Sequence, residues 1–339
     1  MSTEATIDSV SDTPECHTAV LGGEGQVEAV GPNMLARTLI RPPTGWQLVN
    51  LRELWRYREL LFFLAWRDVK VRYKQTVLGA AWAVLQPALM MVVFSIFFGR
   101  LAHVDSGGLP YPLFVFAGLL PWTLFATAIA SAGNSVVGSE RLITKIYFPR
   151  LAIPFAAVGA ALVDFLVAFG MLVVLMFWYR VPPTWGLMVV PVLVALFTLA
   201  ALGVGTLLAA LNVAYRDFRY VIPFLVQLWM FATPSIYMNT EEGSGFRVQE
   251  RVQGSGFRVQ QSDEPLSTNP KSKIENPKLL HSLLALNPLT GLVASFRAAV
   301  LGGPLPWSML GWSSLEVVAS LLVGCLYFRR VEDSFADII

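Results

Sequence analysis

The sequence is poor in charged residues and in cysteine. Asp, Glu, Lys and Arg make up only 14% of its 339 residues, against roughly a quarter in soluble domains. A water-facing surface needs more charge than this, so a soluble enzyme is a poor fit. The net charge of +2 is too small to indicate binding to nucleic acid. The two cysteines, Cys16 and Cys325, lie far apart and indicate neither a disulfide framework nor a zinc site.

Sequence motifs that would mark an active site are also missing. No Lys follows a Gly, so there is no Walker A phosphate-binding loop. None of the three histidines begins an HExxH pair, and no GxSxG occurs. The GVGTLL fragment at 203–208 lies inside an apolar run, where small residues favour close helix packing. We therefore expect no enzymatic activity, no cofactor and no metal in this chain, and if it does work against a gradient the energy must come from elsewhere.

Long apolar runs are what the sequence has in abundance. Apolar residues make up 55% of the chain, and the mean hydropathy is +0.57. The first run has 23 residues and no charge, and at about 1.5 Å per residue a helix of this length crosses a hydrocarbon core of roughly 30 Å. The sequence thus predicts an all-α membrane protein with six transmembrane helices, at about 77–99, 113–133, 151–179, 187–214, 221–238 and 309–328.

The chain before the first run divides into a tail and a helix. Residues 1–36 contain six acids and no Lys or Arg, which excludes a secretory signal and predicts a flexible acidic tail over 1–45 ahead of a membrane domain over 46–339. Within 51–74, apolar and aromatic residues recur at steps of three and four while basic residues occupy other positions. This pattern predicts an amphipathic helix in the membrane interface, with a soluble amphipathic helix as the alternative.

Basic residues predict the orientation of the chain. The short flanks on the side of the two termini hold fourteen Lys and Arg residues, against only Arg100 and Arg180 on the other side. Because short cytoplasmic segments carry an excess of Lys and Arg, we expect both termini to be cytoplasmic.

The connection over 239–308 is expected outside the cell. It contains GSGFRVQ twice, at 243–249 and 254–260, within an insertion over 243–278. We interpret the repeat as a local duplication in a tolerant loop, or as a small hairpin that contacts a transported ligand. Residues 288–302 are apolar but too short to span, which predicts a re-entrant helix at the outer face.

Five stretches of the sequence resemble one family, the membrane subunits of type-2 ABC exporters, in particular the branch that exports polysaccharides. Together with the order of the apolar runs they cover nearly all of 50–339. They are RDVKVRYKQTVLGAAWAVLQP (67–87), GLLPWTLFATAIASAGNSVVGSERLITKIYFPR (118–150), YRDFRYVIPFLVQLWMFATPSIY (215–237), LNPLTGLVASFRAAVLG (286–302) and FRRVEDSFADII (328–339).

The resemblance implies a permease, not an enzyme. It implies a homodimer in the bacterial cytoplasmic (inner) membrane with two copies of a separate ABC-type ATPase, which would hold ATP and magnesium. The substrate would be a lipid-linked polysaccharide of the O-antigen, capsule or teichoic-acid type. An exporter of drugs or small lipids with the same fold is the alternative. A membrane-embedded glycosyltransferase or acyltransferase would need a cluster of catalytic acids or histidines that the sequence lacks.

The resemblance also assigns residues to the ATPase contact and to the outer gate. The ATPase contact maps to the end of the interfacial helix and to a short coupling helix after the second span. Alternatives are charge-based anchoring for the first group and a solvated loop for the second. The contact residues are Arg67, Asp68, Lys70, Arg72, Tyr73, Lys74, Glu140, Arg141 and Lys145. The outer gate maps to Pro288, Phe296 and Arg297.

Polar and aromatic residues in the apolar runs have two interpretations each. Asp164 and Glu316 are costly in lipid, so they either hydrogen-bond helices together, which we favour, or line a hydrated path. Sugars stack on aromatic rings, which makes four aromatic residues candidates for a conduit, although a lipid-facing belt is the alternative for each. They are Tyr220, Phe224, Trp229 and Phe231. In the turn before them, we expect Arg216 and Asp217 to form a structural pair in preference to an ATPase contact.

Overall fold

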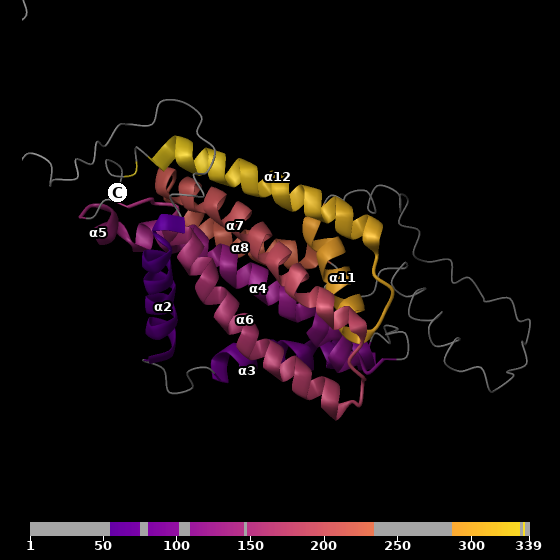
Figure 1. Cartoon of the computed structure of the whole chain (residues 1–339). Coiled ribbons are helices and arrows are strands. Elements are labelled where there is room, and N and C mark those ends of the chain that lie inside the picture. Colours follow the sequence, from indigo (N-terminus) through magenta and orange to yellow (C-terminus); the bar gives the residue numbers. More distant parts are fainter. Residues whose placement is uncertain are drawn as a thin grey trace, which may run out of the picture. The chain divides into compact units, whose positions relative to one another are not determined.

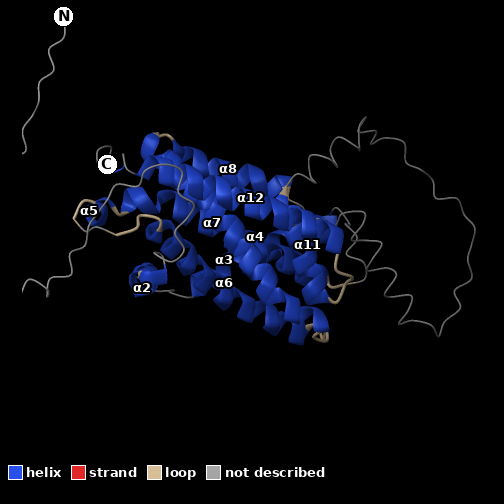
Figure 2. Ribbon diagram, turned by 45° about the horizontal axis from the view of Figure 1, so that its top comes forward, coloured by secondary structure: helices blue, strands red, loops and turns tan. Residues whose placement is uncertain are grey.

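The computed structural model describes residues 55–74, 81–101, 109–145, 148–233, 287–332 and 335. Every regular element in these ranges is a helix (Figures 1 and 2). The predicted acidic tail and the insertion over 243–278 lie outside the described residues. The elements are α2 (Arg58–Lys74), α3 (Ala81–Phe94), the π-helical η1 (Ser95–Leu101), α4 (Tyr111–Gly138), α5 (Glu140–Ile143), α6 (Ala152–Trp178), the 3-10 helix η2 (Trp185–Val189), α7 (Val190–Ala214), α8 (Phe218–Ala232), α11 (Pro288–Leu301) and α12 (Trp307–Val331).

Five helical segments in the described ranges are long and apolar enough to cross a membrane. They match five of the six predicted spans, and a multi-pass all-α membrane protein is confirmed. The segments are Ala81–Gly99, Tyr111–Gly138, Ala152–Trp178, Trp185–Ala214 and Trp307–Val331.

The predicted span at 221–238 corresponds to α8, which is shorter than expected. Its 15 residues reach about 22 Å at 1.5 Å per residue, less than a core of roughly 30 Å. The helix ends at Ala232 because Thr233 takes an extended conformation, with φ −110° and ψ 127°, as expected for a residue that precedes a proline. The six-span count is therefore not confirmed. The helix predicted at 288–302 is present as α11, but no observation tests whether it is re-entrant.

Helix α4 is the centre of the packed core. It packs against α6, α7, α11, α3 and α8, and its residues from Leu113 to Trp122 are all buried. A helix that is apolar all round is stable only when other helices surround it. The neighbours of α4 therefore fix the position of the charged turn that follows its C-terminal end.

Helices α7 and α12 approach so closely that only glycine fits between them. A Cβ atom added to Gly324 would lie 2.0 Å from the carbonyl oxygen of Gly203, and one added to Gly203 would lie 2.6 Å from the backbone nitrogen of Leu321. Small residues allow membrane helices to pack backbone against backbone. The prediction that GVGTLL serves helix packing is confirmed.

The helix predicted within 51–74 is present as α2, but its predicted amphipathic character is wrong. Arg58, Arg67, Lys70 and Arg72 point in different directions around the axis of this helix, and apolar side chains lie between them on every side. The prediction relied on apolar residues spaced at three and four in part of 51–74 and overlooked the basic residues that lie between apolar ones in the rest of the helix. Helix α2 packs against α6, with Ala65 beside Gly159 and Arg72 and Tyr73 beside Asp164 (Figure 1).

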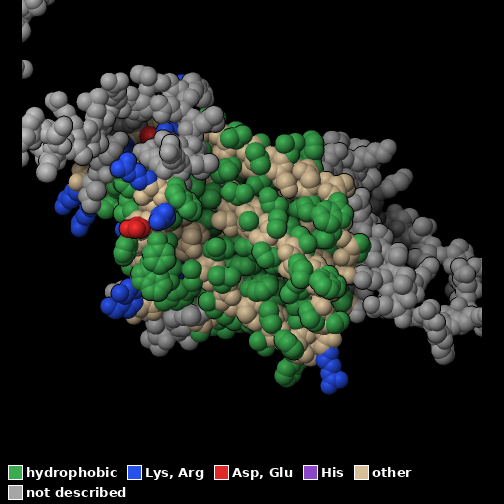
Figure 3. Space-filling model, in the orientation of Figure 1, with side chains coloured by type: hydrophobic (Ala, Val, Ile, Leu, Met, Phe, Trp, Pro, Cys, Tyr) green, Lys and Arg blue, Asp and Glu red, His purple; other side chains and the backbone are tan. Residues whose placement is uncertain are grey.

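Apolar side chains cover the surface between the two ends of the helices, as a membrane protein requires (Figure 3). The exposed apolar residues belong mainly to α3, α6, α8 and α12. Lys and Arg side chains gather at the end that carries α5 (Figure 3).

Candidate functional site

The basic end of the molecule is organised around α5, a single helical turn from Glu140 to Ile143. Ile143 is buried in an apolar cluster with Val136 and Phe148, whereas Glu140 and Arg141 are exposed. The buried isoleucine fixes the turn to the end of α4, so that its charged residues project outward. This is the place where the sequence predicts a short coupling helix.

A first cavity lies between α2 and α5, and we call it the α2–α5 cavity. Its volume is about 410 Å³. It brings together four of the nine residues predicted to contact an ATPase, from two elements far apart in the sequence. The lining residues are Arg67, Val137, Gly138, Ser139, Glu140, Arg141, Leu142 and Lys145.

Asp68, which the sequence places in the same predicted contact, is neutralised inside its own helix. The Arg67 guanidinium pairs with the neighbouring Asp68 carboxylate at 2.9 Å. Both side chains are exposed to a large degree, so the pair contributes little to stability. Lys70 and Lys74 are exposed on α2, and neither lines the α2–α5 cavity.

A second cavity lies on the other side of α5, and we call it the α5–α8 cavity. Its volume is about 380 Å³, and it shares Val137 and Glu140 with the first. The sequence did not indicate it, because its walls come from the ends of α4, α7 and α8 as well as α5. The lining residues are Val137, Glu140, Asn212, Val213, Arg216, Arg219 and Tyr220.

The expected pair between Arg216 and Asp217 does not form among the described residues. Asp217 occupies the N-cap position of α8 in a helical conformation, and its side chain accepts no capping hydrogen bond. Arg216 and Arg219 instead line the α5–α8 cavity. The prediction failed because adjacent residues on this turn diverge.

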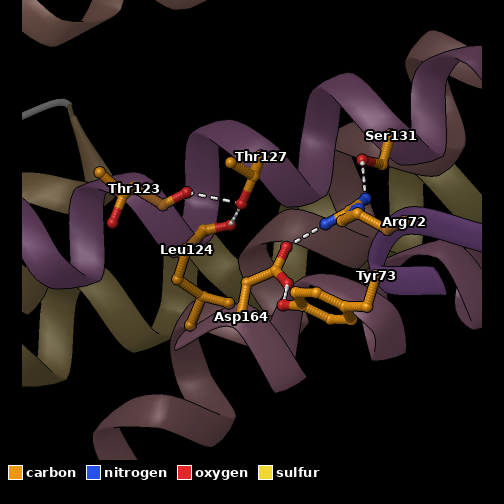
Figure 4. A network of polar contacts seen from close by, with 7 residues as sticks. All are labelled: Arg72, Tyr73, Thr123, Leu124, Thr127, Ser131 and Asp164. Atoms are coloured by element: carbon orange, nitrogen blue, oxygen red, sulfur yellow. Dashed lines mark hydrogen bonds and ion pairs between the residues drawn. The ribbon is translucent and has the colours of Figure 1, made fainter. Parts of the chain in front are cut away.

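Asp164 joins α2 to α6 in a polar network (Figure 4). Its carboxylate accepts hydrogen bonds from the Arg72 guanidinium and the Tyr73 hydroxyl, and Arg72 also donates to Ser131 Oγ of α4 at 3.4 Å. Burial, reinforced by the Asp164 carboxylate, raises the pKa of Tyr73 above its ordinary value. The interpretation that Asp164 hydrogen-bonds helices together agrees with this geometry.

This network separates Arg72 and Tyr73 from the rest of the predicted ATPase contact. Asp164 is twelve residues into α6, or about 18 Å along the helix axis from its start. The nine predicted residues therefore do not form one surface.

Glu316 in α12 is not among the partners of Asp164. One of its carboxylate oxygens, Oε2, is buried and has no hydrogen-bond partner in the described part of the chain. The two intramembrane acids thus have different surroundings, and only Asp164 connects helices.

The predicted outer gate lies in α11, at the opposite end of the molecule from α5 (Figures 1 and 2). Pro288 is the first residue of the helix, and every residue from Leu289 to Leu301 is buried. The Arg297 guanidinium lies 4.1 Å from the centre of the Phe114 ring of α4, in a cation–π contact. Phe296 packs edge-on against Phe165 of α6. Helix α11 is therefore an integral part of the core of this subunit.

Asn287 caps α11 and ties it to the end of α8. Its Oδ1 accepts hydrogen bonds from the Trp229 indole at 3.0 Å and from the Leu289 backbone N–H at 3.2 Å. Its Nδ2 donates to Thr233 Oγ1 at 2.9 Å and to the Ala232 carbonyl at 3.2 Å. Sequence reasoning missed this residue, although Asn followed by Pro is a common helix start.

The four predicted conduit aromatics do not share one face of α8. Tyr220, Phe224 and Phe231 are exposed, whereas Trp229 turns inward and packs edge-on against Phe125 with ring centres 5.2 Å apart. Trp229 is thus a packing residue in this subunit.

Within the ranges that the structure describes, no three His, Cys, Asp or Glu side chains lie close enough to hold a metal ion. The arrangement offers two charged cavities beside a short exposed turn at one end and a closely packed helix at the other. Both cavities offer charged side chains for a partner or ligand.

Comparison with known proteins gives a consistent result. Residues 59–242 match the model of the family described as ABC-2 type transporter. The chain is 30% identical over 291 residues to the O-antigen export system permease protein RfbA of Myxococcus xanthus, covering 85% of this chain and 98% of that protein. It is 24% identical to the protein of the same name from Klebsiella pneumoniae, covering 83% and 95%. It is 21% identical to the polysialic acid transport protein KpsM of Escherichia coli, covering 79% and 92%.

Proposed function

The chain belongs to the ABC-2 type transporter family, and from this membership we propose that it is the transmembrane subunit of an ATP-driven exporter of lipid-linked polysaccharide. The observation that carries the proposal is the similarity along almost the whole length of a permease named for O-antigen export. Its relatives are named for O-antigen export and for polysialic acid transport, so drugs and small lipids are the weaker candidates.

The α2–α5 cavity is the proposed contact with a separate ABC-type ATPase, which would supply the ATP and magnesium chemistry. Four predicted residues support this contact, because Arg67, Glu140, Arg141 and Lys145 line one cavity beside an exposed turn. Two copies of the ATPase and a second copy of this chain complete the proposed exporter, and no nucleic acid takes part.

Arg72 and Tyr73 keep a proposed role in coupling, but an indirect one. Their hydrogen bonds to Asp164 link α2 to α6. A movement that the ATPase imposes on α2 would therefore reach a membrane-spanning helix directly.

The concentration of basic side chains at the α5 end supports a cytoplasmic location for that end and for both termini. The opposite end, with α11, would then face away from the cytoplasm in the bacterial inner membrane. There Pro288, Phe296 and Arg297 would stabilise the closed outer side of the path. Tyr220, at the α5 end of α8, and Phe224 and Phe231 further along it would contact glycan or lipid on the exposed face of that helix.

The test is export by the assembled complex. The purified chain alone should hydrolyse no ATP, whereas the chain co-purified with its ATPase should hydrolyse ATP and deliver lipid-linked glycan across proteoliposome membranes. A complex whose ATPase binds but cannot hydrolyse ATP is the control. Hydrolysis by the isolated chain, or glycan delivery independent of the ATPase, would refute the proposal.

A further inference from the structure

The α5–α8 cavity carries positive charge and lies beside an exposed apolar face of α8. Arg216 and Arg219 both line the cavity, and within the described residues neither side chain forms an ion pair or hydrogen bond. Two guanidinium groups at one cavity, without a protein carboxylate bound to them, supply the charge and the hydrogen-bond donors that phosphate recognition uses.

The cavity wall is made by rigid parts of the protein. Asn212 is buried, and its side-chain amide donates to the Gly133 carbonyl at 2.8 Å and to Asn134 Oδ1 at 3.2 Å. These bonds fix the end of α7 against α4. Arg216 lies in the turn that follows α7, and Arg219 lies in the first turn of α8, so both arginines project from a firmly held base.

Tyr220 connects this charged cavity to the apolar face. It lines the cavity, it is 79% exposed, and it begins a row of exposed apolar side chains along α8. Residues four apart lie on the same side of a helix, so the row forms a continuous strip. The strip consists of Tyr220, Phe224, Leu225, Leu228 and Phe231.

We infer that the α5–α8 cavity binds the phosphate group of the lipid carrier to which the exported glycan is attached, while the hydrocarbon tail lies along the exposed strip of α8. The order of chemical groups matches an amphiphile, with cationic groups at the helix start and apolar groups along the helix. The inference rests on the proposed function only for the identity of this ligand.

Glu140 gives the cavity its selectivity. Its carboxylate lies in the same cavity as the two arginines and repels a bare phosphate, but it can accept hydrogen bonds from sugar hydroxyls. Tyr220 offers a ring on which a sugar can stack. A phosphate that carries a sugar therefore fits this cavity better than a phosphate alone.

The test uses the full-length chain in detergent, with binding of a polyprenyl pyrophosphate measured by native mass spectrometry. The R216A/R219A variant removes two charge-assisted contacts, each expected to weaken binding by about tenfold. R216K/R219K keeps the charge and should retain part of the affinity. R141A/K145A removes the same number of charges from the α2–α5 cavity, and its affinity for this probe should stay close to that of the wild type.

A fourth variant, E140Q, provides a second measurement if the alanine variant does not fold, because the direction of its change in affinity is predicted. E140Q removes the repulsion between carboxylate and phosphate, so it should tighten binding of polyprenyl pyrophosphate and weaken the preference for a sugar-bearing carrier. Unchanged binding in E140Q together with unchanged binding in R216K/R219K would overturn the inference.

Other occupants give other results, and each overturns the inference. Equal competition by phosphatidylglycerol would assign the cavity to ordinary anionic membrane lipid, and binding of inorganic pyrophosphate without the lipid form would assign it to a soluble phosphate. Loss of ATPase co-purification in R216A/R219A with normal lipid binding would assign the arginines to the ATPase. Disulfide formation between two F224C chains would place a second copy on the strip. In all these cases ATP-dependent glycan export by the wild-type complex would still stand, so failure here is distinct from failure of the proposed function.

Discussion

Substituting alanine for Gly324 should separate α7 from α12. The added Cβ would lie 2.0 Å from the Gly203 carbonyl oxygen and 2.7 Å from Thr206 Oγ1. Carbon and carbonyl oxygen ordinarily stay about 3.3 Å or more apart, so the overlap exceeds 1 Å by this estimate. The obstructing atom belongs to the backbone of a buried helix and cannot rotate away, unlike the end of a long side chain.

The expected loss is about 2–3 kcal/mol, the range for forcing an extra methyl group into a packed interior. At roughly 2–4 °C per kcal/mol for a chain of this size, G324A should unfold some degrees below the wild type. Gly311 provides a matched control on the same helix, because a Cβ there would meet nothing within 4 Å. G311A should unfold at or slightly above the wild-type temperature, since alanine favours helix by about 1 kcal/mol over glycine.

The measurement is the unfolding temperature of detergent-purified full-length chains by intrinsic fluorescence. All variants are heated at the same scan rate, because membrane proteins often unfold irreversibly. Equal unfolding temperatures for G324A and G311A would refute the close approach of α7 and α12. A loss in both would instead indicate that any added methyl group on α12 is harmful.

Three further substitutions test the polar contacts. D164A leaves the Arg72 guanidinium without its carboxylate, and since that side chain is 38% exposed the loss should be about 2 kcal/mol, less than for a fully buried pair; a thermal shift no larger than that of E316Q would contradict this. Because the pKa of Tyr73 is raised, its hydroxyl stabilises the fold below the ordinary tyrosine pKa of about 10, and this contribution is lost as the pH rises through the folded pKa. An ultraviolet titration should therefore show one fewer tyrosine resisting ionisation at high pH in Y73F than in the wild type, and equal numbers would refute the hydrogen bond. N287A removes a helix cap, at a cost of about 1 kcal/mol, and should change the Trp229 fluorescence, whereas N287D keeps the acceptor and should preserve it; identical spectra for both variants would contradict the contact.

The sequence predicted those features of the fold that depend on local composition. Five membrane-length helices could be predicted because hydropathy is summed over neighbouring residues in the sequence, without knowledge of distant contacts. The predicted length of the helix at 221–238 was wrong, because an extended Thr233 before Pro234 ends α8 inside an apolar run. The mixed surface of α2 was missed because a spacing pattern was followed through only part of its residues.

The candidate site could be predicted only in part, since its contacts join residues far apart in the chain. The cost of an acid in lipid indicated that Asp164 must be satisfied by protein or water, but not that Arg72 and Tyr73 satisfy it. The α5–α8 cavity depends on how α4, α5, α7 and α8 end beside one another, and no local pattern encodes that arrangement. Adjacency in sequence suggested a pair between Arg216 and Asp217 that the turn does not permit.

The four hydrogen bonds of Asn287 have an engineering consequence. Three of them join residue 287 to the end of α8 and the fourth caps α11, so Thr233 and Asn287 lie within one side-chain length of each other. The contact holds the two ends of any connection between these positions in place, and each doubling in length of a flexible connection costs only about 0.6 kcal/mol. We therefore expect a reporter domain inserted between Thr233 and Asn287 to leave the packing of the helices unchanged.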